Sequence, residues 1–227
     1  PILLIDHHIP SPSSLPHVVE VNPHLVGVDA SSLSSSSVLA YLVAKRVVPS
    51  IQEMSCTAVA GALGDRLDNG EKYSLTGLNA EVVREAKEQG YIEESIGLRL
   101  FGPRSRPIVA ALAATIDPLI PGISGSESAA YEFLRRVGIE PKENDELRPL
   151  SSLSKREEAL LATELVKHML LSGASVREAQ KVVGYNYYSA REPPTSMLKD
   201  LREYAHLLNA LGRMEQYSTG VALSLGR

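Results

Sequence analysis

The sequence predicts an α/β protein with a parallel sheet in its N-terminal part and a largely helical middle part. Two short apolar runs, at 2–5 and 18–21, have the length and composition of β-strands, and the first reads as a buried strand. Longer segments with apolar residues at helical spacing follow them. From about residue 96 the sequence changes to loops and short helices, punctuated by Gly-Pro, Asp-Pro and Pro-Gly. This order favours a layered α/β part followed by a helical part.

The composition is ordinary for a soluble globular protein: 227 residues, of which 44% are hydrophobic and 22% charged. The net charge of −4 gives no overall attraction to nucleic acid, so such a contact requires a local basic patch. The single cysteine, Cys56, excludes an internal disulfide and fits a reducing cytoplasm. No apolar run approaches the roughly eighteen residues of a membrane helix. We therefore expect a cytoplasmic protein without a membrane partner.

Three short strands are expected near the N-terminus, at 2–5, 18–21 and 25–28. A serine run at 31–37 then precedes the first helix. Serines in this position are usually helix N-caps, and the alternative is that their hydroxyls approach a phosphate together with the N–H groups of the helix.

Seven helices are expected from apolar periodicity and end signals. They lie at 38–48, 51–63, 76–89, 126–137, 155–171, 175–183 and 196–211. The charged stretch at 140–149 indicates an exposed connection, and the tyrosine group at 185–188 is typical of a local core, with base stacking as the alternative. A last strand is expected at 219–226.

Four residues are the strongest candidates for a metal site. Asp6, His7 and His8 directly follow the first strand, and ligands and metals lie at this carboxyl edge in open α/β sheets. Asp65 follows an apolar helix that Gly64 ends, where a carboxylate is costly to desolvate unless it is paired or bound to a cation. Asp68 is the second choice, with loop capping as its alternative role.

A small basic cluster, Arg104 and Arg106, lies on a predicted loop. Such a cluster usually serves surface solubility, and contact with a phosphate backbone is the functional alternative. The first residues already read as an interior strand, and no initiator Met precedes them. We therefore expect the chain to be a fragment of a longer protein.

Two motifs resemble the DHH phosphoesterase superfamily. The segments Leu-Ile-Asp-His-His at 4–8 and Gly-Ala-Leu-Gly-Asp at 61–65 are similar to its third and fourth motifs. Three further segments, at 101–107, 117–122 and 201–213, resemble the archaeal RecJ-like branch, which includes the nuclease associated with the GINS replication complex. The first two motifs of the family normally precede Asp-His-His, and the chain does not contain them.

The resemblance implies a fold and its division. Residues 1–97 would be the C-terminal part of the parallel-sheet DHH catalytic domain, and 98–190 a largely helical insertion. Residues 191–213 would form a connecting helix, and 214–227 the first strand of a truncated DHHA1 domain.

The resemblance also implies an activity, namely metal-dependent phosphodiester hydrolysis by a RecJ-like exonuclease that acts on single-stranded DNA or RNA in replication or repair. Two Mn²⁺ or Mg²⁺ ions serve that reaction in the family, and this chain would hold only part of their site. His7 and Asp65 would be ligands of one metal, and Asp6 would ligate or orient an imidazole. His8, Arg104 and Arg106 would contact the substrate.

Several expectations remain open beside this one. The fragment is expected to be inactive alone, and the GINS complex is a possible partner of the parent. One alternative is a non-catalytic replisome scaffold that binds GINS. The other is a DHH phosphatase or oligoribonuclease for small nucleotides.

Overall fold

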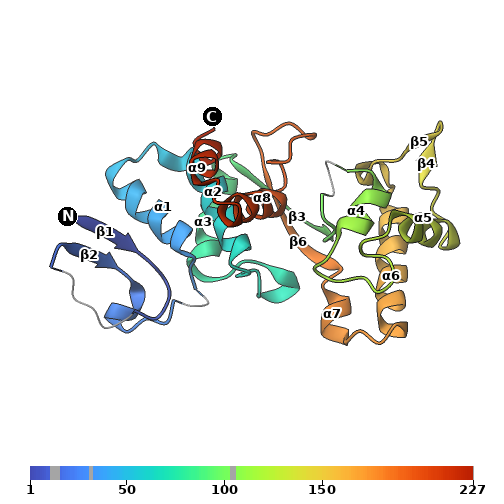
Figure 1. Ribbon diagram of the computed structural model, residues 1–227, viewed down its shortest axis with the longest axis horizontal. Helices are drawn as coiled ribbons and strands as arrows, with labels where there is room; N and C mark the ends of the chain where they lie inside the picture. Colours follow the sequence, from blue (N-terminus) through green and yellow to red (C-terminus); the bar gives the residue numbers. More distant parts are fainter. Residues whose placement is uncertain (11–15, 31–32, 103–105, 227) are drawn as a thin grey trace. The chain divides into compact units, whose positions relative to one another are not determined.

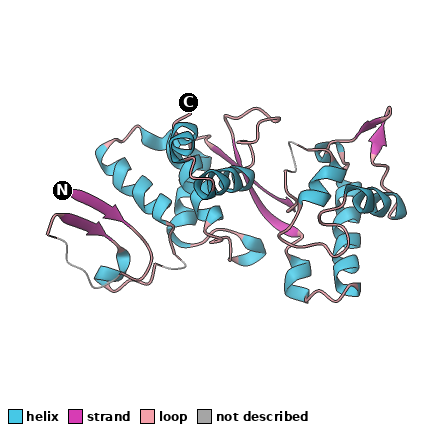
Figure 2. Cartoon of the chain, in the orientation of Figure 1, coloured by secondary structure: helices cyan, strands magenta, loops and turns pink. Residues whose placement is uncertain are grey.

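A computed structural model describes residues 1–10, 16–30, 33–102 and 106–226 of the chain (Figure 1). Helices predominate, and the strands form small sheets (Figure 2). The chain divides into two compact units, one of which comprises Pro1–Glu93, Tyr188–Arg191 and Tyr204–Arg227, and the other Glu94–Tyr187 and Glu192–Glu203. No helix in the described ranges is long and apolar enough to cross a lipid bilayer.

The elements of the first unit up to residue 93 are short strands followed by helices. They are β1 (Ile2–Ile5), β2 (Val18–Val21), η1 (Pro23–Val26), α1 (Ser36–Val47), η2 (Ile51–Met54), α2 (Ser55–Gly64), η3 (Glu71–Tyr73) and α3 (Gly77–Glu88). The chain continues through β3 (Ile92–Leu98), α4 (Ile108–Ala114), α5 (Glu127–Arg136), β4 (Lys142–Glu143), β5 (Glu146–Leu147), η4 (Leu150–Ser152), α6 (Lys155–Leu171) and α7 (Val176–Gln180). It ends with β6 (Val183–Ser189), α8 (Leu201–Arg213) and α9 (Tyr217–Ser224).

β1 and β2 pair in parallel, with Ile2 opposite Val18 and Ile5 opposite Val21. The strands expected at 2–5 and 18–21 are therefore present, while the larger parallel sheet of a DHH domain stays a prediction. The expectation of a buried first strand is wrong, since Ile2 is 63% and Leu3 55% exposed. The reason is that β2 is the one strand paired with β1 in the described part of the chain.

The helices of the first unit form its core. α1 contacts both β1 and α2, and α2 contacts α3. Each contributes fully buried side chains, among them Val38, Val59 and Val82. Ser35 caps α1, because its Oγ accepts a hydrogen bond from Val38 N at 3.2 Å. This confirms the N-cap interpretation of the serine run.

The prediction of a third strand at 25–28 is wrong, because Pro23–Val26 form the 3₁₀-helical turn η1. Asn22 starts it by accepting a hydrogen bond from His24 N at 3.1 Å, and Pro23 lies at its first position. Gly27 ends it with a φ of 79°. Proline at the start and glycine after the end are strong helical signals, and they prevail over the apolar run between them.

The second unit has its own hydrophobic core around α4, α5 and α6. α6 spans the predicted range, and its inner face buries Leu161, Leu165 and Met169 completely. α5 begins one residue after the predicted start, because Ser126 is its N-cap. The exposed stretch at 140–149 contains the hairpin of β4 and β5, so its exposure is confirmed and its strands are an addition.

The C-terminal predictions need two corrections. The helix expected at 196–211 begins at Leu201, since Asp200 Oδ1 caps it by accepting from Arg202 N at 2.8 Å. The strand expected at 219–226, taken as the first strand of a DHHA1 domain, is instead the helix α9. A short apolar run fits strand and helix equally well, and here Gly220 N donates to Gln216 O at 3.0 Å in the helical i to i−4 pattern.

β3 and β6 have no counterpart among the predicted strands, although they form a two-stranded sheet. The sequence of β3, Ile-Glu-Glu-Ser-Ile-Gly-Leu, lacks the strict alternation that marks a half-buried strand. β6 contains the tyrosine group. Tyr187 and Tyr188 are 3% and 5% exposed, which confirms their expected role in a local core.

Candidate metal centre

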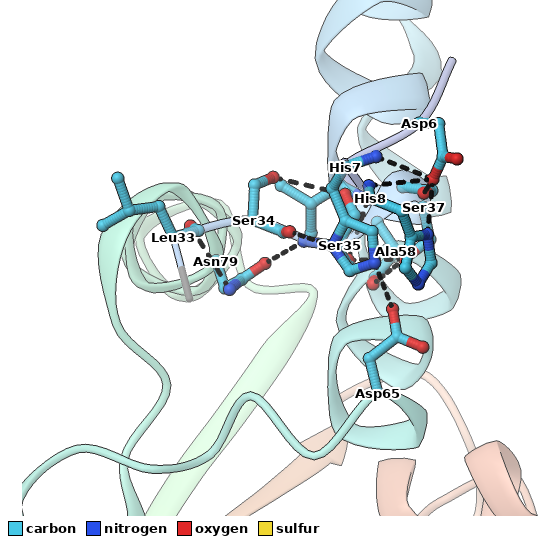
Figure 3. Close-up of polar contacts among 12 residues, drawn as sticks. Asp6, His7, His8, Leu33, Ser34, Ser35, Ser37, Ala58, Asp65 and Asn79 are labelled. Atoms are coloured by element: carbon cyan, nitrogen blue, oxygen red, sulfur yellow. Dashed lines mark hydrogen bonds and ion pairs between the residues drawn. The ribbon is translucent and has the colours of Figure 1, made fainter. Parts of the chain in front are cut away.

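Asp6 organises the loop that follows β1. Its Oδ1 accepts hydrogen bonds from His7 N at 2.7 Å, from His8 Nδ1 at 2.8 Å and from Ser36 Oγ at 3.0 Å (Figure 3). Burial by itself raises the pKa of the Asp6 carboxyl, but these hydrogen bonds outweigh it and hold the pKa well below its ordinary value. Asp6 is therefore a carboxylate at neutral pH.

His7 is buried, and the position of its proton follows from its partner. Its Nδ1 lies 2.5 Å from the carbonyl oxygen of Ser34, and its side chain is 7% exposed. A carbonyl oxygen only accepts hydrogen bonds, so Nδ1 carries a proton, and in the neutral imidazole Nε2 presents a lone pair. This Nε2 lies 3.9 Å from Asp65 Oδ2.

His8 is held in the opposite environment, with 75% of its side chain exposed. Its Nδ1 donates to Asp6, so the carboxylate selects the tautomer whose Nε2 lone pair is available to a ligand. The rings of His7 and His8 meet edge to face, with centroids 4.3 Å apart. Asn22 Nδ2 holds the same loop by donating to His8 O at 3.0 Å.

Asp65 reaches this loop from the C-terminal end of α2, which it caps by donating from its N to Gly61 O at 3.0 Å. α2 lies close to α1 at this end: a Cβ on Gly61 would lie 2.1 Å from Ser37 Oγ. Ser37 Oγ in turn donates to Ala58 O at 2.9 Å. Gly61 and Ser37 together permit the close approach of α1 and α2, four residues before Asp65 in the chain.

The four leading candidates are thus brought together in the first unit. The ligand atoms of Asp6, His7 and His8 lie within 4.8 Å of one another, and Asp65 adds a carboxylate beside His7. Asp68, the second choice, follows Asp65 in the loop beyond α2.

The basic cluster is only partly described. Arg104 lies outside the described residues. Arg106 belongs to the second unit, where its Nε lies 3.4 Å from Glu203 Oε1 and its guanidinium lies over the Phe101 ring at 5.2 Å. Gly102 leaves the space for this contact, since a Cβ there would lie 2.5 Å from Arg106 Cδ. Arg106 therefore has a structural partner in its own unit, and its contact with substrate stays a prediction.

The donor set fits a divalent cation. Two bonds of about 2.1 Å each span a little over the 3.9 Å between His7 Nε2 and Asp65 Oδ2, so one ion can contact both atoms. Carboxylate and imidazole ligands suit Mn²⁺ or Mg²⁺ rather than the metals that thiolates select. Both imidazoles donate their other N–H to an oxygen, the arrangement that orients histidine ligands in metal sites.

Two contributors lie in the serine run, which was interpreted as a cap. The Ser34 carbonyl orients His7, and the Ser36 hydroxyl stabilises the Asp6 carboxylate. Their only sequence signal is the run itself, because backbone carbonyls leave no trace in residue type.

Comparison with known proteins finds similarity to one domain family and to one archaeal protein. Residues 100–183 match the family model of the DHH-CID domain, a domain of the DHH phosphoesterase superfamily. Members of this superfamily are typically phosphoesterases that use divalent metals. The chain is also similar to an uncharacterized protein of Methanocaldococcus jannaschii, with 29% identity over 196 residues. That alignment covers 81% of this chain and 44% of the relative, so the chain spans less than half of the relative's length.

Proposed function

We propose that the protein hydrolyses phosphodiester bonds of single-stranded DNA or RNA as a RecJ-like exonuclease with Mn²⁺ as its metal. The observation that carries the proposal is the juxtaposition of Asp6, His7 and His8 with Asp65 at the end of β1. The DHH-CID match supports the same chemistry from a separate segment of the chain. The branch within the superfamily rests on the sequence resemblance.

Each residue of the centre has a separate task in this proposal. His7 Nε2 and Asp65 Oδ2 would hold one cation, and the chemistry that such a cation would supply is activation of water and neutralisation of phosphoryl charge. Asp6 holds the loop through its hydrogen bonds and fixes the His8 ring. The exposed Nε2 of His8 would contact a phosphate oxygen in the imidazolium form, in which Nε2–H donates to the phosphate while Nδ1–H donates to Asp6.

The proposal extends to the organisation of the chain. Residues 1–97 would belong to the DHH catalytic domain, 98–190 to a helical insertion and 191–213 to the connecting segment. Residues 214–227 would begin the DHHA1 domain with a helix rather than a strand. The two-metal site would be completed by ligands other than those of this chain, and GINS would be a partner of the whole protein.

Replacing the carboxylate at the centre tests the activity. In the full-length protein, Asp65→Asn is expected to abolish Mn²⁺-dependent cleavage of a labelled single-stranded oligonucleotide, because the amide removes a charged ligand while keeping its shape. Asp145→Asn is the matched control, because Asp145 is exposed and has a φ of 65° that asparagine tolerates. This variant should cleave the oligonucleotide like the wild type. Wild-type cleavage by the Asp65 variant contradicts the metal assignment.

The length of the preferred substrate separates an exonuclease from an enzyme for small nucleotides. We expect faster turnover of a long oligonucleotide than of a dinucleotide under the same Mn²⁺ concentration. Faster turnover of the dinucleotide would replace the exonuclease with an oligoribonuclease or phosphatase acting at the same centre.

A further inference from the structure

Asn79 contacts the backbone of residues 33–35, next to the metal centre, and has no hydrogen bond to the predicted ligands. We propose that Asn79 is a positioning residue, which fixes the orientation of the His7 imidazole through the Ser34–Ser35 peptide group. The proposal rests on the proposed function, since His7 matters only if its Nε2 binds a cation. Asn79 belongs to α3, is completely buried and lies within the first turn of that helix.

The side chain of Asn79 bridges the two peptide groups on either side of Ser34. Its Oδ1 accepts from Ser35 N at 3.1 Å, and its Nδ2 donates to Leu33 O at 3.4 Å (Figure 3). The partners determine which way the amide points, because a backbone N–H only donates and a carbonyl only accepts. An apolar side chain of the same size would satisfy neither group.

One planar peptide group connects Asn79 to His7. The carbonyl of Ser34 and the N–H of Ser35 belong to the same trans peptide, so they point in opposite directions. Asn79 holds the N–H on one side, and the carbonyl therefore points away from it, to His7 Nδ1 at 2.5 Å. Restraining one end of this group restrains the other, and hydrogen bonds at both ends polarise each other.

The surroundings leave this peptide group little freedom. Ser34 and Ser35 are both fully buried, and Leu33 O also accepts from Leu78 N at 2.9 Å. Gly77 makes this approach possible, because a Cβ there would lie 2.5 Å from Leu33 O. Turning the peptide would leave a buried N–H without an acceptor, which is unfavourable. Asn79 removes that alternative.

The consequence for His7 is a single tautomer. With Nδ1 protonated, Nε2 presents its lone pair toward Asp65. If the Ser34 carbonyl turns away, the proton can move to Nε2, and that nitrogen can no longer bind a cation without first losing it. Outer-shell hydrogen bonds of this kind usually change metal affinity by about 10–100-fold.

The first measurement needs no metal. Long-range ¹H–¹⁵N NMR of the purified, metal-free protein reports which imidazole nitrogen of His7 is protonated. We expect the Nδ1–H form alone in the wild type and a mixture of tautomers in Asn79→Ala. The matched control is Val83→Ala, which removes a buried side chain (5% exposed) from the same helix α3 and should leave the Nδ1–H form intact.

The second measurement is Mn²⁺ affinity, which is determined by electron paramagnetic resonance on the same three proteins. Asn79→Ala should bind Mn²⁺ roughly ten-fold more weakly, and Val83→Ala like the wild type. If Asn79→Ala does not fold, Asn79→Ser, whose side chain is too short to bridge both peptides, should show the same two changes. Equal tautomers and equal affinities in the Asn79 and Val83 variants overturn the proposal.

The two readouts also separate this proposal from the function it rests on. A wild type that binds no Mn²⁺ overturns the metal centre, whereas the tautomer of His7 in the metal-free protein still decides the role of Asn79. A mixture of tautomers in the wild type itself overturns the role of Asn79 whatever the metal affinity.

Discussion

At two carboxylates in this chain, Asp6 and Glu157, surrounding hydrogen-bond donors lower the pKa below its ordinary value. The pKa of Asp6 is lowered by hydrogen bonds from the imidazole of His8, two backbone N–H groups and the hydroxyl of Ser36. Glu157 is a second case, in the other unit, where Arg148 and the capping box of α6 surround it. At both positions local hydrogen bonds extend the pH range over which the carboxyl group stays ionised.

Glu157 gives a pH-dependent prediction. The hydrogen bond from Arg148, followed by those from Ser154, lowers the pKa of Glu157 from 4.5 to about 2. A carboxyl group whose pKa is lowered in the folded state stabilises the fold at pH values above its ordinary pKa. This contribution is lost as the pH falls from 4.5 toward 2. Arg148→Met should therefore cost roughly 1 kcal/mol of unfolding free energy at pH 7 and less at pH 3, as measured by urea denaturation.

A neighbouring ion pair provides the control for that experiment. Lys155 contacts Glu158 at 3.1 Å, but its side chain is 95% exposed, so Lys155→Met should change stability little at either pH. An Arg148 variant with the same stability loss at pH 7 and pH 3 would contradict the role assigned to Glu157.

Helix packing decides where the ligands of the centre meet. α1 and α2 approach closely because residue 61 has no side chain, and Asp65 follows four residues later at the end of α2. A buried glycine facing a serine hydroxyl is a packing feature, and its effect on the centre follows from the position of Asp65.

Gly61→Ala tests this packing. The new methyl group would lie 2.1 Å from Ser37 Oγ, so we expect a loss of roughly 1–3 kcal/mol in unfolding free energy together with weaker Mn²⁺ binding. Gly212→Ala is the matched control: no atom lies within 4 Å of its new Cβ in α8, and helix propensity predicts unchanged or slightly higher stability. Equal stability of the two variants in thermal denaturation would argue against the close helix approach.

The elements differ in how well residue pattern predicts them. α6 matches its predicted range because Ser154 and Glu157 form a capping box ahead of a regular apolar stripe. α9 and η1 were expected as strands because a short apolar run has no period to distinguish the two states. β3 was not expected, since its charged residues interrupt the alternation and its pairing with β6 comes from a distant segment.

On the scale of the whole molecule, the sequence predicts the ligands of the centre better than their support. Asp6, His7 and His8 are adjacent in the chain, so their proximity needs no fold, and Asp65 was expected from its position after a buried helix. Ser34 and Asn79 act through backbone groups that only the tertiary structure brings together. The DHH-CID match lies at 100–183, outside the range of these four candidates, and is therefore independent of them.

The central claim is that His7 and Asp65 hold one divalent cation beside Asp6 and His8. Its most direct test is a Mn²⁺ titration that is monitored by electron paramagnetic resonance. The titration is carried out on the purified wild type, on Asp65→Asn and on the Asp145→Asn control. We predict saturable binding by the wild type and the control, and binding at least about ten-fold weaker by the Asp65 variant, because the amide lacks the charge of a carboxylate ligand. Equal affinity of all three proteins would contradict the account.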